Sequence, residues 1–327
     1  MNSFGRLFRM SIFGESHGEM TGVLIDGCPP GIELKEEDFL PDIERRKAGI
    51  TGTSSRTEKD IPKFSSGIYK SHSSGAPILI TFENENFSSE EYKNVENIPR
   101  PGHADFAATR KYEAYNDLRG GGHFSGRLSL PLVAVGVIAK KIINPILVKS
   151  RILTVNNSPN IEQEVQKALL ERDSIGGVVE CRIENVPIGL GEPFFDSIES
   201  IISHLIFSIP AVKGIEFGAG FNSAAMKGSE MNDVIADVSG KTKTNNSGGI
   251  NGGISNGNPI VFRLAVKPAS SIGKAQTSIN LTSGKMEDFE IHGRHDTCIA
   301  LRMPPIFEAV AAIALADFML INKSYSK

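Results

Sequence analysis

The sequence predicts one α+β domain in which an apolar helix lies between sheets. Residues 128–143 are apolar nearly all round, and a helix of that kind is buried on every side. Strand-like and helix-like segments recur in both halves of the chain, which indicates a pseudo-duplicated architecture. No linker-like stretch separates the halves, so we expect residues 1–327 to form one intertwined domain.

The composition is that of a soluble globular protein, with 40% hydrophobic and 22% charged residues. The formal net charge of -3 gives no basic field for binding nucleic acid. Cys28, Cys181 and Cys298 lack CxxC spacing, which indicates reduced thiols. The longest apolar run, 128–139, is too short to span a bilayer, and the N-terminus alternates like a strand. We therefore expect a cytoplasmic protein that binds neither membrane nor nucleic acid.

The N-terminal part predicts a β-hairpin. Apolar and polar residues alternate at 7–13 and 20–25, and the glycine-bounded segment 14–18 separates the two predicted strands. Ser16 and His17 are therefore expected at the hairpin tip.

The next segments predict a short helix, a loop and two strands. Residues 36–46 look helical, with Pro41 interrupting or restarting the helix. Residues 50–63 are rich in Thr, Ser and Gly and predict a loop, whereas 68–69 and 76–82 predict strands.

The same patterns place the remaining elements. Helices are expected at 104–118, 128–143, 161–172, 197–208 (with Asp196 as N-cap) and 305–322. Strands are expected at 146–155, 177–183, 214–217 and 259–266. The Gly/Asn/Ser-rich segment 242–258 predicts a long loop, and loops of that length inside a domain are usually functional or disordered.

The segment 100–127 carries the strongest indication of a site. It begins with a turn containing His103 and reaches three consecutive glycines, 120–122, before the apolar helix. Glycines let a backbone approach a ligand closely and direct N–H groups toward an anion. Arg100 and Arg127 supply bidentate donors for phosphate or carboxylate. We predict an anion-binding wall beside a titratable histidine.

Histidines are the first candidates for acid–base chemistry, because their pKa lies near neutrality. His17 and His103 both lie in glycine-bounded, polar turns. Either could instead be a structural residue whose hydrogen bonds are satisfied. No metal site is predicted, since His292 and His295 are separated by an arginine, which repels a cation.

Two further segments leave a ligand site and an ordinary turn as open alternatives. The glycines of 120–127 lack the ending of a P-loop, and no dinucleotide fingerprint occurs. Residues 267–271 place a lysine and two serines after a strand, which suits a phosphate. Asp296 could hold the tautomer of a histidine or act as a base, or it could cap a helix or pair with Arg294.

Arginines gather near the glycine and histidine motifs, which together favour a small polyanion as ligand. They are Arg45, Arg46, Arg100, Arg119, Arg127, Arg294 and Arg302.

An ordered set of short motifs resembles the chorismate synthase family from Leu7 to about Asp317. The motifs are GESHG (14–18), DGCPPG (26–31), RPGHAD (100–105), RGGG (119–122), SGR (125–127), GEP (191–193), AVKG (211–214), KP followed by SS (267–271) and GRHD (293–296). Each motif is short, whereas the ordered set is specific.

The resemblance implies a lyase of the shikimate pathway, which serves aromatic amino acid biosynthesis. The implied reaction is the trans-1,4 elimination of phosphate from 5-enolpyruvylshikimate 3-phosphate, which gives chorismate. It implies reduced FMN without net redox change, with NADPH as a candidate reductant. It also implies a homotetramer and a β-α-β sandwich, in which helices pack between antiparallel sheets.

Site residues follow from the resemblance, position by position. It implies that His17 and His103 are catalytic, one protonating the departing phosphate and the other acting on the flavin, with Asp296 as a proton relay. The implied substrate-binding residues are Ser16, Arg46, Arg100, Ser125, Arg127 and Arg294. The implied cofactor-binding residues are His123, Phe124, Ser125, Pro210, Ala211, Gly252, Lys267, Pro268, Ala269, Ser270, Ser271 and Arg294, with Arg46 linked to the pyridine nucleotide.

The chain departs from the family pattern at several ligand positions. His123 and Phe124 stand where the family has Arg and a small residue, and Pro210 stands where it has Asn. A second family arginine aligns near Gly52, with Arg56 as the nearest substitute, so that position is not carried over.

Two other classes of function remain open from the sequence. A flavin-dependent reductase could use the same pocket for net hydride transfer, and would then oxidise NADPH stoichiometrically. A phosphometabolite-binding protein without catalysis would not need two histidines inside motif turns.

Overall fold

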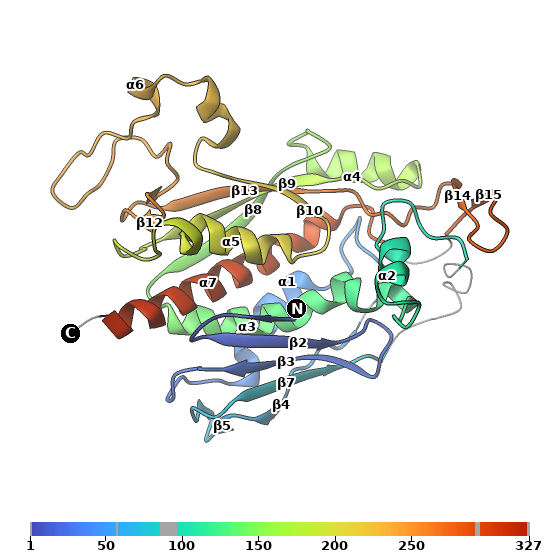
Figure 1. Ribbon diagram of the computed structural model, residues 1–327, viewed down its shortest axis with the longest axis horizontal. Helices are drawn as coiled ribbons and strands as arrows, with labels where there is room; N and C mark the ends of the chain where they lie inside the picture. Colours follow the sequence, from blue (N-terminus) through green and yellow to red (C-terminus); the bar gives the residue numbers. More distant parts are fainter. Residues whose placement is uncertain (1, 57, 86–96, 292–294, 326–327) are drawn as a thin grey trace.

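The computed structural model describes residues 2–56, 58–85, 97–291 and 295–325. Within these ranges two antiparallel sheets enclose a layer of helices (Figure 1). The first sheet has the order β1 (Ser3–Phe4), β2 (Arg9–Gly14), β3 (Met20–Asp26), β7 (Ile78–Glu83) and β4 (Lys63–Ser66). The second has the order β10 (Val212–Phe217), β13 (Ile260–Val266), β9 (Gly177–Glu184) and β8 (Leu147–Val155). The expected β-α-β sandwich is confirmed.

Two long helices, α3 (Ser129–Ile142) and α7 (Met303–Tyr325), form the centre of the helical layer. They cross closely, because a Cβ built at Gly136 would lie 2.3 Å from the Ala309 Cβ. α3 also packs against the first sheet and α7 against the second. The apolar segment predicted from the sequence is thus the buried centre of the fold.

These helical regions also explain a membrane-like pattern in the sequence. The helical stretches 119–142 and 299–325 are long and apolar enough to cross a membrane by length and composition alone. However, 78% of the most apolar window of each lies buried inside the fold, as in the core helices of a globular protein. The sequence analysis compared only the run 128–139 with the thickness of a bilayer and did not make that comparison for the predicted helix 305–322.

Shorter elements complete the fold. The remaining helices are α1 (Leu40–Arg46), α2 (Asp105–Lys111), α4 (Ile161–Leu170), α5 (Ile198–Phe207) and α6 (Gly228–Met231), with short 3₁₀ turns between several of them. Three small hairpins are β5 (Ile68–Tyr69) with β6 (His72–Ser73), β11 (Ile250–Asn251) with β12 (Ile254–Ser255), and β14 (Gln276–Ile279) with β15 (Met286–Phe289). The hairpin β11–β12 lies inside the segment predicted as a long loop.

Two sequence predictions about helix ends were wrong. The helix expected to extend to Leu118 ends at Lys111, because Glu113 and Ala114 adopt left-handed backbone angles (φ 54° and 64°) that a right-handed helix cannot contain. The N-cap of α5 is Ser197 and not Asp196. The Ser197 side chain accepts a hydrogen bond from the backbone N–H of Ser200, which Asp196 does not do.

Candidate active site

A cavity of about 600 Å³ opens where the central helices begin. Ser129 at the start of α3 and Met303 at the start of α7 both line it. Helix N-termini favour anions, because their free N–H groups and dipoles point outward. The volume is typical of a pocket for a small molecule. The tip of the β2–β3 hairpin, the loop before β4, the triple glycine and the segment after β13 contribute the other walls.

The described lining carries an excess of positive charge. Six of its side chains are cationic and three are acidic. The cations are Arg46, Lys47, Arg56, Arg127, Lys267 and Arg302, and the acids are Glu58, Asp60 and Asp296. This excess fits a ligand with several negative charges.

The triple glycine, residues 120–122, packs against the tip of the β2–β3 hairpin. Gly120, Gly121 and Gly122 all have positive φ (58°, 82° and 52°), and the Ser16 N–H donates to the Gly122 carbonyl at 3.1 Å. A Cβ on Gly120 would lie 2.4 Å from His17 Nε2. The glycines were predicted to admit a ligand. In the structure Gly120 makes room for the His17 ring, so it helps to place a histidine at the cavity wall.

His17 is neutral in this environment. Burial, and then the positive charge of Arg56, lower its pKa to about 4. Arg56 Nη1 and Nη2 donate to the Ser16 hydroxyl (3.2 Å) and carbonyl (3.3 Å), so the guanidinium lies beside the hairpin tip. An anion bound at Arg56 would offset that charge and favour protonation of His17.

His103 is held by a buried carboxylate. Its Nδ1 lies 2.5 Å from Asp105 Oδ1 and 3.0 Å from Arg100 Nη2, and the shorter contact assigns the Nδ1 hydrogen to Asp105. Burial alone would raise the pKa of the Asp105 carboxyl. Hydrogen bonds from Arg100 and His103 outweigh burial and hold that pKa well below its usual range. Asp105 thus orients the ring of His103 at the cavity wall.

Arg100 is engaged with Asp105 and does not line the cavity. Its Nε and Nη2 donate to the two carboxylate oxygens of Asp105 at 2.7 and 2.8 Å, and Nη1 donates to Ser271 Oγ at 3.1 Å. Arg100 therefore supports His103 and Ser271, and its expected contact with substrate stays a prediction.

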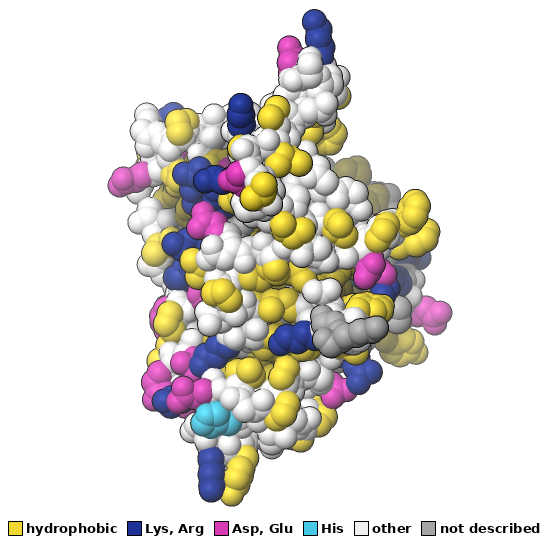
Figure 2. Space-filling view, turned by 90° about the vertical axis from the view of Figure 1, so that its left-hand side faces the viewer, with side chains coloured by type: hydrophobic (Ala, Val, Ile, Leu, Met, Phe, Trp, Pro, Cys, Tyr) yellow, Lys and Arg dark blue, Asp and Glu magenta, His cyan; other side chains and the backbone are white. Residues whose placement is uncertain are grey.

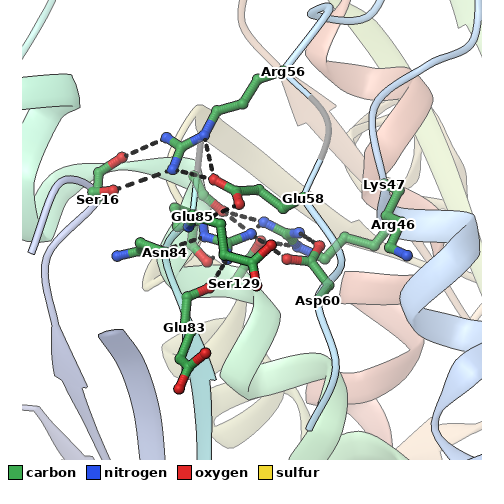
Figure 3. Close-up of polar contacts among 12 residues, drawn as sticks. Ser16, Arg46, Lys47, Arg56, Glu58, Asp60, Glu83, Asn84, Glu85 and Ser129 are labelled. Carbon is green, nitrogen blue, oxygen red and sulfur yellow. Dashed lines mark hydrogen bonds and ion pairs between the residues drawn. The ribbon is translucent and has the colours of Figure 1, made fainter. Parts of the chain in front are cut away.

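A network of arginines forms the floor of the cavity (Figure 3). Asp60 contacts both Arg46 and Arg127, and Arg46 Nε donates to Ser129 Oγ at 3.1 Å. Burial, and then the charge of Arg302, lower the pKa of Arg46 to about 9, which leaves the guanidinium protonated at neutral pH.

Another part of the lining combines apolar groups with a lysine and hydroxyls. Ala211 adopts a strained φ of 72°, and Pro210 beside it also lines the cavity. Lys267 Nζ donates to the Gly102 carbonyl (2.5 Å) and to Ser270 Oγ (3.0 Å), which groups a cation and a hydroxyl at one edge. Apolar side chains of Phe124 and neighbouring residues face the same space. This part of the lining therefore offers apolar surface beside a cation and hydroxyls.

The structure brings most of the sequence-predicted site residues to this one cavity. Those that line it are Ser16, His17, Arg46, His103, His123, Phe124, Ser125, Arg127, Pro210, Ala211, Lys267, Pro268, Ala269, Ser270, Ser271 and Asp296. Arg100 does not line it, and Gly252 lies in the turn of the β11–β12 hairpin, also outside the lining. Arg294 and the predicted pairing of Asp296 with it lie outside the described residues.

Two predicted residues make contacts that the sequence did not indicate. His123 Nδ1 lies 2.8 Å from the Gly14 carbonyl and Nε2 lies 3.1 Å from Asn2 Oδ1, so its ring also fastens the start of the hairpin turn. Asp296 accepts a hydrogen bond from the Ser54 N–H (2.8 Å) and pairs with Arg302 at 3.1 Å.

Sequence reasoning missed Glu58 and Asp60 in the loop before β4, and it named Arg56 only as the nearest substitute for a family arginine, without giving it a role. Arg56, Glu58 and Asp60 all line the cavity, although the Thr/Ser/Gly-rich segment around them predicted only a polar loop. The available signal was their spacing, since an arginine and two acids at alternate positions can turn to one side of an extended chain.

The fold, and a cation-lined cavity with histidines on its wall, are those expected of an enzyme that acts on a small anionic molecule. The family model described as chorismate synthase matches residues 8–320. A chorismate synthase from Chitinophaga pinensis is 61% identical over 324 residues, covering 99% of this chain and 98% of its own length. One from Pyrococcus abyssi is 43% identical over 348 residues, covering 98% of each.

A solved structure described as "Crystal Structure of Chorismate Synthase" is similar throughout, with a TM-score of 0.75 and 25% sequence identity. The match covers 98% of this chain and 93% of that one. The chain belongs to the chorismate synthase family, whose members are lyases of the shikimate pathway.

Proposed function

We propose that the cation-lined cavity is where this chain carries out the reaction of its family, the trans-1,4 elimination of phosphate from 5-enolpyruvylshikimate 3-phosphate to give chorismate. The observation that carries the proposal is that His17 and His103 line the same cavity as an excess of cationic side chains. The substrate has a phosphate and two carboxylates, so its charge complements this lining. Elimination breaks a C–O and a C–H bond, and both steps need controlled proton movement.

Arg46, Arg56 and Arg127 hold the substrate anions, with the hydroxyls of Ser16 and Ser125 beside them. A phosphate bound at Arg56 and Ser16 lies close to His17, because Arg56 contacts Ser16 directly. The negative charge then raises the pKa of His17 from its low resting value, and the ring can deliver a proton to the departing phosphate.

His103 is the second acid–base group. Asp105 fixes its Nδ1 hydrogen, which leaves Nε2 on the side of the triple glycine, 3.5 Å from where a Gly121 Cβ would lie. In this proposal His103 acts toward the flavin side of the cavity. The Asp296 carboxylate, which the Ser54 N–H and Arg302 hold in place, accepts and releases the relayed proton.

Reduced FMN is the proposed cofactor, and it supplies transient electron or proton transfer that side chains cannot provide. The residues proposed to hold it are His123, Phe124, Ser125, Pro210, Ala211 and the segment 267–271. Gly252 and Arg294 remain proposals by resemblance. NADPH is the proposed reductant. Arg46, linked to the pyridine nucleotide by resemblance, is only 2% exposed, which favours a role toward the substrate.

Anaerobic incubation with dithionite-reduced FMN and the substrate tests this function. We expect chorismate and phosphate in equal amounts, and no net flavin oxidation. His17→Ala and His103→Ala should each lower turnover at least about 100-fold with unchanged circular dichroism, the usual scale for losing an acid–base group. Full turnover in either variant would contradict the assignment. Stoichiometric NADPH oxidation without chorismate would identify a reductase instead.

We also propose that the chain is a cytoplasmic homotetramer with one domain per subunit. Apolar side chains lie open across the face in Figure 2. Phe194, Phe195 and Phe221 are 87%, 91% and 83% exposed, which supports contacts with other subunits. Sedimentation equilibrium should give four times the subunit mass, and a monomer at micromolar concentration would exclude this assembly.

A further inference from the structure

Asp60 is one of the most buried charged groups of the cavity lining. Its side chain is 2% exposed and lies between the guanidinium groups of Arg46 and Arg127, which are 2% and 6% exposed. Arg127 Nη1 donates to Asp60 Oδ1, and Arg46 Nη1 lies 3.5 Å from Asp60 Oδ2. One carboxylate therefore serves two buried arginines.

Further hydrogen bonds fix the positions of the two guanidinium groups together with Asp60. Arg127 Nε donates to Asn84 Oδ1 at 2.9 Å, and its Nη2 donates to the Glu83 carbonyl at 3.3 Å. Arg46 Nη2 donates to the carbonyls of Gly126 (3.2 Å) and Arg127 (3.4 Å). Figure 3 shows Arg46 from α1, Asp60 from the loop before β4 and Asn84, which follows β7, close together.

The local charge does not balance within this group. Two cations share one anion, and all three groups are withdrawn from water. A buried positive charge is unfavourable unless an anion compensates it. An anion bound on the cavity side would compensate the remaining positive charge.

The backbone of Asp60 is also unusual. Its φ is 53°, in the left-handed region that few residues other than glycine adopt. Such strain persists where the surroundings require a particular side chain in a particular place.

We propose that Asp60 is a positioning residue, a shared carboxylate that aims Arg46 and Arg127 at the ligand while leaving one positive charge for the substrate to neutralise. The proposal rests on the proposed function for its substrate. Asp60 acts through the two arginines, because its carboxylate contacts both guanidinium groups.

Asp60→Asn is the decisive variant, since asparagine has the same shape and tolerates a left-handed backbone. Asp317→Asn is a matched control. As whole residues, Asp317 is 5% exposed and Asp60 is 4% exposed. Asp317 lies away from this cavity and accepts hydrogen bonds from the backbone N–H groups of residues 6, 7 and 8. Both variants lose one buried negative charge, but only one loses it beside the two arginines.

The first measurement is the melting temperature of ligand-free protein titrated with inorganic phosphate. In Asp60→Asn, phosphate replaces the missing carboxylate, so the increase in melting temperature should be at least twice that of the wild type. Asp317→Asn should be less stable but should respond to phosphate like the wild type. An equal phosphate response in Asp60→Asn and the wild type would overturn the proposal. This readout needs no turnover, so it remains informative if the proposed reaction is wrong.

The second measurement is steady-state kinetics with reduced FMN. Asp60→Asn should lower kcat/KM at least tenfold, whereas Asp317→Asn should stay within about twofold of the wild type. If Asp60→Asn does not fold, Asp60→Glu carries the test, because it keeps the charge but displaces it by one methylene. It should keep the wild-type phosphate response while kcat/KM falls at least threefold. Wild-type kcat/KM in either Asp60 variant would overturn the proposal.

Discussion

At the scale of single residues, His17 illustrates how environment decides chemistry. Its ring is 6% exposed and lies beside Arg56, and both features disfavour the imidazolium. The sequence could predict that His17 lies at a hairpin tip near glycines. It could not predict the neighbour that controls the proton, because Arg56 lies 39 positions later in a loop without periodicity. The same holds for Asp60, which only the folded loop brings between two arginines.

The depressed pKa of His17 makes stability depend on pH. The folded-state pKa of about 4 lies below the unfolded value of 6.5, so between these values the unfolded chain binds the extra proton. This contribution to stability is fully present above pH 6.5 and is lost as the pH falls toward 4. Between pH 7 and pH 5, the wild type should lose about 2 kcal/mol more than His17→Gln in urea unfolding. Parallel pH profiles for the two proteins would show that the histidine titrates normally.

At the scale of elements, regular sequence periodicity predicted helices and strands, whereas segments without periodicity gave no prediction of their structure. The hairpin β2–β3, the helix α3 and the strands β8, β9 and β13 lie close to where alternation or continuous apolarity predicted them. The sequence analysis missed the hairpin β14–β15, because its two strands are short and mostly polar. The sequence also did not predict the contacts of the triple glycine, since a run of glycines indicates that some group lies close to the backbone but not which group it is.

The triple glycine offers a test of that close approach. In Gly120→Ala the new Cβ would meet His17 Nε2 at 2.4 Å, and alanine would also have to adopt a φ of 58°. The ring must move, and a displacement of about 1 Å costs on the order of 100-fold in rate. We therefore expect kcat/KM to fall by about that factor while substrate-free FMN binding changes little.

The control is Gly228→Ala in α6, where a Cβ meets nothing within 4 Å. It should retain wild-type kcat/KM. Activity of Gly120→Ala within threefold of that control would show that the glycine does not position His17.

At the scale of the whole molecule, the sandwich depends on how closely its two central helices approach. The sequence predicted an apolar helix between sheets, and α3 is that helix. Its partner α7 carries Ala309 against Gly136, so the small residues at the crossing let both helices lie within one layer between the two sheets. A sequence pattern can predict a buried helix, but not which distant small residue it will meet.

Gly136→Ala tests this contact and the proposal of a single domain together. The new Cβ would lie 2.3 Å from the Ala309 Cβ and 2.5 Å from its Cα, so the helices must separate. Overpacking typically costs about 1–3 kcal/mol, which outweighs the gain of roughly 1 kcal/mol from replacing a helical glycine. Because α3 packs on one sheet and α7 on the other, calorimetry should show one unfolding transition shifted as a whole to lower temperature. Gly228→Ala should leave that transition in place. Two transitions, of which only one moves in Gly136→Ala, would mean that the two sheets belong to separately folding units.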